Sequence, residues 1–347
     1  METDTRSDEI RAGGDPGARA DRRSGTWRVL AGWTAALTLT GVSVVLLCRI
    51  LDVDGVTPVP QLLAFLPWLL LPGAVAAALA ALARWRTGLV WGAVVLAVTG
   101  LFCRPYGEPA EPEGRAVAQL RVLTSNIEFG GATEELLSAV RRERPDLVFV
   151  QECDPGCSAA LKERLGGRFP YRTLVEATGA EGSAILSRYP LKRGPGVDGT
   201  LGMPGAVAAV EGHSVRLQLA HPMPPVPGGV GLWRAELAEL EHWARDGSGQ
   251  PTVLAGDFNA SQDHAAFRRV LDTGLRDSTR LAGGARTPTW PASTASGTPS
   301  LGAQIDHVLV SRDFTARAAR FLDLPHTDHR SLVVDLTLHA REAPERG

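Results

Sequence analysis

The sequence predicts an α+β protein in which two β-sheets pack face to face with helices outside them, preceded by transmembrane helices. Three observations lead to this prediction. From Gln119 onward, short apolar runs recur with mostly loop connections and only a few helical stretches, which is typical of packed sheets. Long apolar stretches with almost no acid fill residues 27–103. The length of 347 residues also exceeds that of one usual compact domain.

The N-terminal part is expected to contain a tail and three membrane spans. Residues 1–26 are charged and poor in large apolar side chains, which predicts a disordered tail. The apolar stretches at 27–50, 61–83 and 87–103 approach or exceed the roughly 20 residues that cross a bilayer as a helix. We therefore expect residues 27–103 to form three transmembrane helices, and the alternative is a set of buried core helices.

Arginines at the ends of these stretches predict the orientation in the membrane. They precede the first stretch and separate the second from the third, whereas residues 51–60 carry two aspartates and no base. The arginines in question are Arg22, Arg23, Arg28, Arg84 and Arg86. Because basic residues stay inside, we expect a cytoplasmic N-terminus and an extracellular C-terminal domain. A twin-arginine export signal at Arg22-Arg23 is the alternative, and it would export the same domain.

A tether and a cysteine pair follow. Residues 104–118 are rich in Pro, Gly and Glu, which predicts an extended linker to a globular domain at 119–340. Cys153 and Cys157 frame the sequence Cys-Asp-Pro-Gly-Cys. In an exported domain they can form a disulfide. The loop between them is tight for that bond, so incidental thiols are the alternative.

The globular part alternates strands with few helices. Helices are expected at 131–146, where acids lie in the first turn and arginines in the last, and at 233–246, where apolar residues have helical spacing. Strands are expected at 120–129, 146–152, 183–191, 215–222, 251–259, 304–311 and 326–338. Residues 289–303 are of low complexity and predict a loop, where Trp290 is expected to pack more readily than to line a cleft.

Polar side chains at the strand ends indicate a site for phosphate chemistry. Asn126, Glu128 and Glu152 offer oxygen atoms of the kind that Mg²⁺ prefers. Histidines and aspartates at other strand ends add acid–base capacity, and together these groups fit phosphoryl transfer. Asp257 and Asn259 can alternatively be plain turn residues, because both side chains bond their own backbone readily.

Six ordered motifs resemble those of the endonuclease/exonuclease/phosphatase superfamily. They are Asn-Ile-Glu (126–128), Gln-Glu (151–152), His-Pro (221–222), Gly-Asp-Phe-Asn (256–259), Ile-Asp-His-Val-Leu (305–309) and Thr-Asp-His-Arg (327–330). The resemblance covers about residues 119–339, and it is specific because the order is shared, whereas any one motif alone is weak. It implies a two-sheet β-sandwich flanked by helices, with four layers in the order αββα.

The resemblance implies a metal site and an activated water. Glu152 is expected to hold Mg²⁺, for which Mn²⁺ can substitute, with Asn126 and Glu128 beside it. Asp328 is expected to approach the metal or the water. Asp257 is expected to orient or deprotonate the attacking water. Solvent-facing positions at the strand end are the alternative for Asn126 and Glu128.

The resemblance also implies phosphate-binding groups. Asn259, His221 and Asn126 are expected to bind phosphate oxygens, and His221 can also assist the leaving group. Asp306 is expected to pair with His329, fixing its tautomer and favouring a protonated imidazole that faces the scissile phosphate. The neighbouring His307 is expected to point away, because successive side chains of a strand lie on opposite faces.

The membrane spans and the charge pattern favour a lipid-linked substrate. The formal net charge is -2 and the arginines are scattered, so no basic stripe marks a nucleic-acid binder. N-terminal spans followed by such a domain resemble the VanJ-type teicoplanin-resistance membrane proteins of actinobacteria. That resemblance implies a cell-surface phosphohydrolase acting on a lipid-linked envelope intermediate, with the bilayer as its partner and no obligate protein partner. The alternatives are an anchored extracellular nuclease and a catalytically inactive binding or sensor domain.

Overall fold

The computed structural model describes residues 16–107, 114–284, 286–292 and 301–340, with side chains from residue 25 onward. Within these ranges the chain forms two compact units. The helical unit comprises the chain up to Leu46 together with Leu69–Leu101. The sandwich unit comprises Leu47–Trp68 together with the chain from Phe102 onward. The predicted tail up to residue 15 and the middle of the predicted linker, at 108–113, lie outside the described residues.

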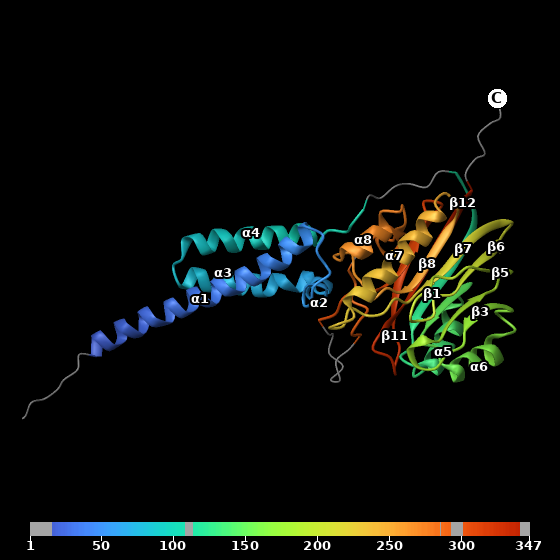
Figure 1. Cartoon of the computed structure of the whole chain (residues 1–347), viewed down its shortest axis with the longest axis horizontal. Helices are drawn as coiled ribbons and strands as arrows, with labels where there is room; N and C mark the ends of the chain where they lie inside the picture. The colour runs from blue at the N-terminus through green and yellow to red at the C-terminus, as the bar shows by residue number, and fades with distance from the viewer. Residues whose placement is uncertain (1–15, 108–113, 285, 293–300, 341–347) are drawn as a thin grey trace, which may run out of the picture. The chain divides into compact units, whose positions relative to one another are not determined.

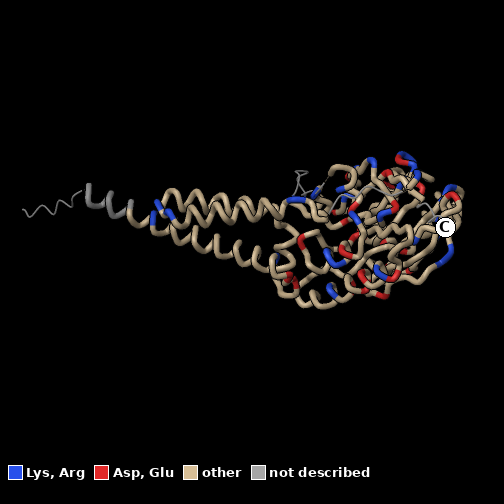
Figure 2. Tube along the Cα trace, turned by 90° about the horizontal axis from the view of Figure 1, so that it is seen from above, with Lys and Arg blue, Asp and Glu red and all other residues tan. Residues whose placement is uncertain are grey.

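The helical unit is apolar on its outer surface. Its helices are α1 (Pro16–Ile50), α3 (Leu70–Leu82) and α4 (Arg86–Phe102), along which Figure 2 shows few charged residues. Large apolar side chains such as Trp33, Leu37 and Val90 are each more than 60% exposed. Small residues bring α3 and α4 together, since a Cβ on Gly92 would lie 2.9 Å from that of Ala77. A unit of this size in water would bury such side chains instead.

The helices differ from the expected spans in two respects. Residues 16–26 were expected to be disordered, but α1 begins at Pro16, because the Ala-rich and Arg-rich segment before the apolar stretch favours a helix. The expected span 61–83 is interrupted after α2 (Val59–Ala64) by the 3₁₀ turn η1 (Leu66–Leu69). Pro67 explains the break, because it lacks the backbone N–H of an α-helical turn.

By length and composition, one helix in the described chain, Gly25–Ile50, can cross a membrane. Leu66–Leu82 and Arg86–Phe102 are shorter apolar helices, so the three complete spans of the prediction are not found. A long apolar helix near the N-terminus is compatible with a membrane anchor or with a signal sequence.

The sandwich unit contains two six-stranded mixed sheets (Figure 1). The first has the order β11 (Phe314–Asp323), β12 (Arg330–Ala340), β1 (Arg115–Asn126), β2 (Leu147–Gln151), β4 (Ser183–Ser187), β3 (Tyr171–Val175). The second has the order β5 (Leu191–Gly194), β6 (Gly205–Val210), β7 (His213–Ala220), β8 (Thr252–Asp257), β10 (Asp306–Val310), β9 (Arg276–Asp277). The pairs β1–β2 and β7–β8 are parallel, and the other pairs are antiparallel.

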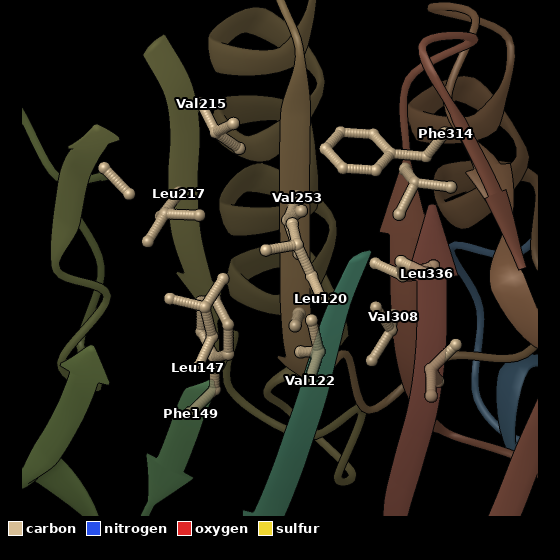
Figure 3. Close-up of a cluster of buried hydrophobic side chains, with 14 of the residues drawn as sticks. Leu120, Val122, Leu147, Phe149, Val215, Leu217, Val253, Val308, Phe314 and Leu336 are labelled. Atoms are coloured by element: carbon tan, nitrogen blue, oxygen red, sulfur yellow. The ribbon is translucent and has the colours of Figure 1, made fainter. Parts of the chain in front are cut away.

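The sheets meet through an apolar core and carry helices on their outer faces, as the sequence predicts. Figure 3 shows Leu120 and Phe149 of the first sheet in one cluster with Leu217, Val253 and Val308 of the second. The flanking helices are α5 (Thr133–Glu143) and α6 (Pro155–Leu165) on the first sheet, and α7 (Val230–Asp246) and α8 (Ala265–Leu271) on the second. Shorter turns are η2 (Gly179–Glu181) and α9 (Ser278–Leu281). The four layers therefore follow the order αββα.

Some boundaries of the sandwich differ from the prediction. The first strand begins at Arg115, inside the expected linker 104–118. The expected strand 183–191 is two strands, β4 and β5, which belong to different sheets. Ser187 forms the turn between them, because its hydroxyl bonds both the amide N and the carbonyl O of Tyr189. The segment Leu47–Trp68, which we call the docked segment, was expected in the membrane region but packs with the sandwich.

The topology brings several strand ends to one edge. In each half a parallel pair is joined through a helix, β1–α5–β2 in the first sheet and β7–α7–β8 in the second. Both pairs therefore end at the same edge, where the antiparallel strands β10 and β12 begin. Asp306, the first residue of β10, is directly opposite Asp257, the last residue of β8. This edge carries the motif residues predicted from the sequence.

Candidate active site

The site lies where the two sheets meet at this edge. Asn126 ends β1, Glu152 follows β2, His221 follows β7 and Asp257 ends β8. A hydrogen bond of 3.2 Å from Asn126 Nδ2 to Asp257 Oδ2 connects the first sheet to the second. The sequence could place each of these residues at a strand end, but only the parallel pairing of the strands makes the ends converge.

The backbone of Glu152 has an unusual conformation. Its φ is +58°, a region that non-glycine residues seldom adopt, and Glu128 and Asn259 share this property with φ of +45° and +48°. Such strain is held only where the surroundings enforce it. The Glu152 carboxylate accepts hydrogen bonds from Asn126 Nδ2 at 3.0 Å and from the amide of Phe129 at 3.0 Å.

The oxygen atoms around Glu152 fit a hard divalent cation. Each carboxylate oxygen of Glu152 accepts one hydrogen bond within the described chain, which leaves lone pairs for a ligand bond, and the side chain is 14% exposed. Glu128 and Asp328 lie beside it at the rim, where the Asp328 amide donates to Glu128 Oε2 at 2.9 Å. Asn126 Oδ1 accepts from the Glu128 amide at 3.1 Å. Carboxylates and an amide oxygen are the ligand types of Mg²⁺ and related ions.

Asp257 is buried in the centre of the site. Its Oδ1 accepts a hydrogen bond from the amide of Asn259 at 2.8 Å. Burial, opposed by the nearby His329 and reinforced by Asp306, raises the pKa of Asp257 to about 7. The preceding Gly256 has φ +154°, and a Cβ there would lie 2.0 Å from the carbonyl oxygen of Ala220 in β7. Only glycine therefore lets β8 approach β7 at this point.

His329 is held as a cation between carboxylates. Its Nδ1 lies 3.0 Å from Asp306 Oδ2, and its Nε2 lies 3.8 Å from Asp257 Oδ2 and 3.7 Å from Asp328 Oδ1. Burial alone would lower the pKa of His329, but the Asp306 and Asp257 carboxylates together raise it to about 10. The ligand atoms of Asp257, Asp306 and His329 lie within 4.8 Å of one another, close enough for a metal. A protonated imidazole has no lone pair for a metal, so His329 could ligate one only after losing a proton.

His221 and His329 have opposite electrostatic surroundings. His221 is buried, with Nε2 3.8 Å from Glu152 Oε1 and 4.0 Å from Asp257 Oδ2. Burial, reinforced by the His329 cation, lowers the pKa of His221 to about 3, so the ring is neutral. Its buried Nδ1 has no hydrogen-bond partner in the part of the chain that the structure describes. An orphaned polar atom in such a place is a group that a ligand can satisfy.

Asn259 is fixed by its neighbours. Its Nδ2 donates to the carbonyl of Pro222 at 3.0 Å, and its own carbonyl accepts from Trp233 Nε1 at 3.1 Å. One amide hydrogen of the side chain is thus used within the protein, and the second has no acceptor among the residues that the structure describes. The side chain lies at the wall of the cavity described next.

A cavity of about 760 Å³ opens above these residues. Glu128, Glu152, His221, Asp257, Asn259, Asp328 and His329 all line it. Its other walls are largely apolar and include Phe65, Phe129, Val226, Trp290 and Leu301. Among the described residues that line it, none is a lysine or an arginine. The volume is within the range of pockets that hold a small organic ligand.

His307, inside the fifth motif, and Trp290, outside the motifs, lie in different surroundings. His307 points away from the site, as predicted, because Nδ1 lies 2.7 Å from Asp277 and Nε2 lies 3.0 Å from the Ala260 carbonyl. Trp290 was expected to be a packing residue, but it lines the cavity and its Nε1 donates to Asp328 Oδ2 at 2.7 Å. The sequence did contain a signal for this role, namely a single tryptophan in a loop otherwise rich in Pro, Ser and Thr.

Cys153 and Cys157 are joined by a disulfide directly after Glu152. Asp154, between them, caps α6 by accepting a hydrogen bond from the Cys157 amide at 2.8 Å. The disulfide and the cap together fix the backbone that directly follows Glu152. The sequence left both the disulfide and incidental thiols open.

Known proteins share this fold. The model of the Endonuclease/Exonuclease/phosphatase family matches residues 123–329. The uncharacterized protein YbhP of Escherichia coli K12 is 27% identical over 216 residues, which are 52% of this chain and 82% of YbhP. An endonuclease/exonuclease/phosphatase from Beutenbergia cavernae has a similar crystal structure, with a TM-score of 0.52, 22% identity and coverage of 65% of this chain and 72% of that one. The 3′ phosphatase NExo of Neisseria, in complex with a product DNA hairpin, gives a TM-score of 0.52 at 20% identity over 62% of this chain and 98% of its own.

Proposed function

Because the chain belongs to the endonuclease/exonuclease/phosphatase family, whose members are metal-dependent phosphoesterases and nucleases, we propose a specific function for it. It is a membrane-anchored, Mg²⁺-dependent phosphohydrolase with its catalytic domain outside the cell. Its substrate is a phosphate ester or pyrophosphate of a lipid-linked cell-envelope intermediate. The observation that carries this proposal is the cavity of about 760 Å³, which combines the phosphate-chemistry residues with apolar walls and, among described residues, no lysine or arginine.

The site residues have different roles in hydrolysis. Glu152 holds the cation, with Asn126, Glu128 and Asp328 beside it, and a bound Mg²⁺ supplies charge neutralisation at the phosphate. Asp257 orients the attacking water and accepts its proton, which a carboxylate with a pKa of about 7 can do.

The remaining residues act on the phosphate. The His329 imidazolium, kept charged by Asp306, faces the same space as Asp257 and stabilises negative charge on the phosphate oxygens. His221 and Asn259 donate hydrogen bonds to those oxygens. A ring with a pKa of about 3 is a poor proton donor at neutral pH, so we assign His221 to phosphate binding rather than to the leaving group.

The apolar walls favour a lipid-linked substrate over a nucleic acid. A nucleic-acid cleft holds the phosphate backbone with lysine and arginine side chains, and the described lining has none. Phe129 and Leu301, which line the cavity, are more than half exposed. An apolar chain that covers such side chains on binding gains the free energy of their burial.

Three features support the location at the outer face of a membrane. The helix Gly25–Ile50 can cross a bilayer, and the helical unit exposes large apolar side chains that lipid would cover. Arginines flank this helix on the side expected to be cytoplasmic. The disulfide between Cys153 and Cys157 suits an oxidising compartment. The resemblance to teicoplanin-resistance proteins extends the proposal to a role in glycopeptide resistance.

A substrate screen tests the proposal. The full chain, purified in detergent, is assayed with Mg²⁺ for phosphate release from undecaprenyl pyrophosphate and inositol phosphates, for phosphocholine release from sphingomyelin, and for cleavage of DNA. We expect release from the polyprenyl substrate, and Asp257→Asn as the matched control should abolish it. Rapid DNA degradation that is strongly reduced by salt, with the polyprenyl substrate intact, would establish the nuclease alternative. Resistance that survives Asp257→Ala in cells would favour the binding alternative.

A further inference from the structure

The docked segment, Leu47–Trp68, is bound to the sandwich by buried polar contacts. His264 is fully buried, and its Nε2 donates to the carbonyl of Pro60 at 2.7 Å while its Nδ1 accepts from the Ser261 amide. Asp54, 1% exposed, accepts a hydrogen bond from the Ala266 amide at 2.7 Å. Buried groups of this kind are costly to leave unpaired. The segment is therefore a fixed part of the sandwich unit.

Ion pairs add to this attachment. Arg268, 4% exposed, donates to Asp52 of the docked segment. Asp263, fully buried, lies 3.6 Å from Arg49 and also accepts two hydrogen bonds from Arg286. Removing the segment would take one charged partner from each of the buried side chains of Arg268 and Asp263, which costs more than losing a surface pair.

The same segment forms one wall of the substrate cavity. Gln61, Ala64 and Phe65 line it. The ring of Phe65 lies 6.4 Å from that of Trp290, at an interplanar angle of 49°. Gln61 Nε2 donates to the carbonyl of Pro225, in the proline-rich stretch that forms another part of the wall. The docked segment thus connects two walls that the family motifs do not include.

Exposed apolar side chains are concentrated in this cavity. From residue 115 onward in the described chain, the exposed large apolar residues are Phe129, Tyr171, Val226, Leu232 and Leu301, and three of these line the cavity. Phe65 completes the apolar surface from the side of the docked segment, five residues before α3 in the sequence. Such a surface beside phosphate-binding groups matches a ligand with a charged head and an apolar chain.

We propose that the docked segment is a specificity element of the active site, in which Phe65 and Trp290 bind the apolar chain of the phosphate substrate. This inference rests on the proposed function and adds the residues that select the substrate. A short, polar phosphate ester reaches the same catalytic groups but does not contact the Phe65 ring. The enzyme therefore distinguishes substrates by the length of the apolar chain next to the phosphate.

A series of soluble substrates measures this selection. The full chain in a mild detergent, below the critical micelle concentration of the substrates, is assayed with p-nitrophenyl alkyl phosphodiesters whose alkyl chains increase in length from two to ten carbons. We expect kcat/KM of the natural sequence to rise with chain length, by up to about fourfold for each fully buried methylene. Phe65→Ala should reduce the ratio of the rates for the longest and shortest substrates by at least about fivefold, mainly through KM.

Control variants separate this effect from loss of folding. Leu62→Ala removes an exposed apolar side chain of the docked segment that is outside the cavity lining, and it should leave the ratio unchanged. Phe65→Leu keeps an apolar side chain and should give an intermediate ratio. Thermal melting curves verify that each variant is folded.

Two different results would overturn the inference, and they can be told apart. If the natural sequence shows no dependence on chain length, the lipid-linked substrate itself is refuted, and the inference fails with it. If the natural sequence prefers long chains but Phe65→Ala keeps the full ratio, the proposed substrate stands and the docked segment has no part in selection.

Discussion

The pairing of Asp306 with His329 gives a prediction that can be worked out in numbers. We consider Asp306→Asn, which keeps the size of the side chain and removes its charge. Asp306 Oδ2 lies 3.0 Å from His329 Nδ1, and both side chains are more than 90% buried. The carboxylate is therefore the nearest of the charges that keep the imidazole protonated.

Coulomb's law gives the size of the change. At 3.0 Å and an effective dielectric constant of about 20, the attraction between the two charges is roughly 5 kcal/mol, equal to about four pKa units. Asp306→Asn should therefore lower the pKa of His329 from about 10 to about 6. At pH 7.5 the charged fraction falls from nearly all molecules to about 3%, which predicts a loss of about thirtyfold in kcat/KM.

The pH–rate profile of a soluble phosphodiester at saturating Mg²⁺ is the assay. Because the pKa of His329 is raised above its ordinary 6.5, both its charge and its contribution to stability persist below that value and are lost only as the pH rises through about 10. The natural sequence should thus show no loss from His329 across neutral pH. Expressed as a ratio to the rate of the natural sequence at the same pH, the rate of Asp306→Asn should fall as the pH rises through about 6 and recover in more acidic buffer.

A second aspartate–histidine pair provides the control. Asp277 lies 2.7 Å from His307, outside the site, and Asp277→Asn should lower the melting temperature without a new inflection in the pH–rate profile. The reasoning about Asp306 is refuted if Asp306→Asn retains full activity at pH 7.5. A loss of activity that is constant from pH 5.5 to pH 9 would also refute it, because that result points to geometry rather than charge.

Three further predictions concern the metal, the backbone and the disulfide. Glu152→Gln should reduce Mg²⁺-dependent kcat/KM by at least about a hundredfold. The measurement is a Mg²⁺ titration of the chelator-treated variant, and a rate at saturating Mg²⁺ equal to that of the natural sequence would contradict this prediction. In denaturant titrations, Gly256→Ala should lower the free energy of unfolding by roughly 2–4 kcal/mol, because its Cβ would meet a backbone carbonyl of β7 at 2.0 Å. Gly231→Ala is the control: a Cβ there has nothing within 4 Å, and this substitution should raise the free energy of unfolding by up to about 1 kcal/mol. Replacing Cys153 and Cys157 by serine should cost roughly 2 kcal/mol of stability. Thiol alkylation of the denatured, unreduced protein should label two of the 4 cysteines, and labelling of all of them would contradict the disulfide.

Most of the sandwich could be predicted from local patterns. The strand ending in Asp257 is recognisable because an apolar run stops at Gly256, and α7 because apolar residues recur at helical spacing. The order of the six family motifs predicted, in addition, which strand ends lie together in the site. The switch of the chain between sheets near Ser187 could not be predicted, because sheet membership is decided by long-range pairing and leaves no local signal.

The docked segment shows a second limit of sequence patterns. Hydropathy assigned residues from 61 onward to a membrane span, since apolar side chains that line a cavity resemble those that face lipid. The deciding contacts come from distant residues, such as the hydrogen bond between Pro60 and His264. The family resemblance implied the protonated state of His329. The neutral state of His221 was out of reach, because it depends on the burial of the ring and on the His329 cation that folds beside it.

The position of the bound metal tests the account most directly. Crystals of the protein soaked with Mn²⁺ would locate the ion by its anomalous scattering. We predict a peak at direct ligand distance from the Glu152 carboxylate, with His329 bonded to Asp306 and not to the metal. A peak bound by His329 Nε2 between Asp257 and Asp306, with none at Glu152, would contradict both the metal site and the role of His329 as a cation.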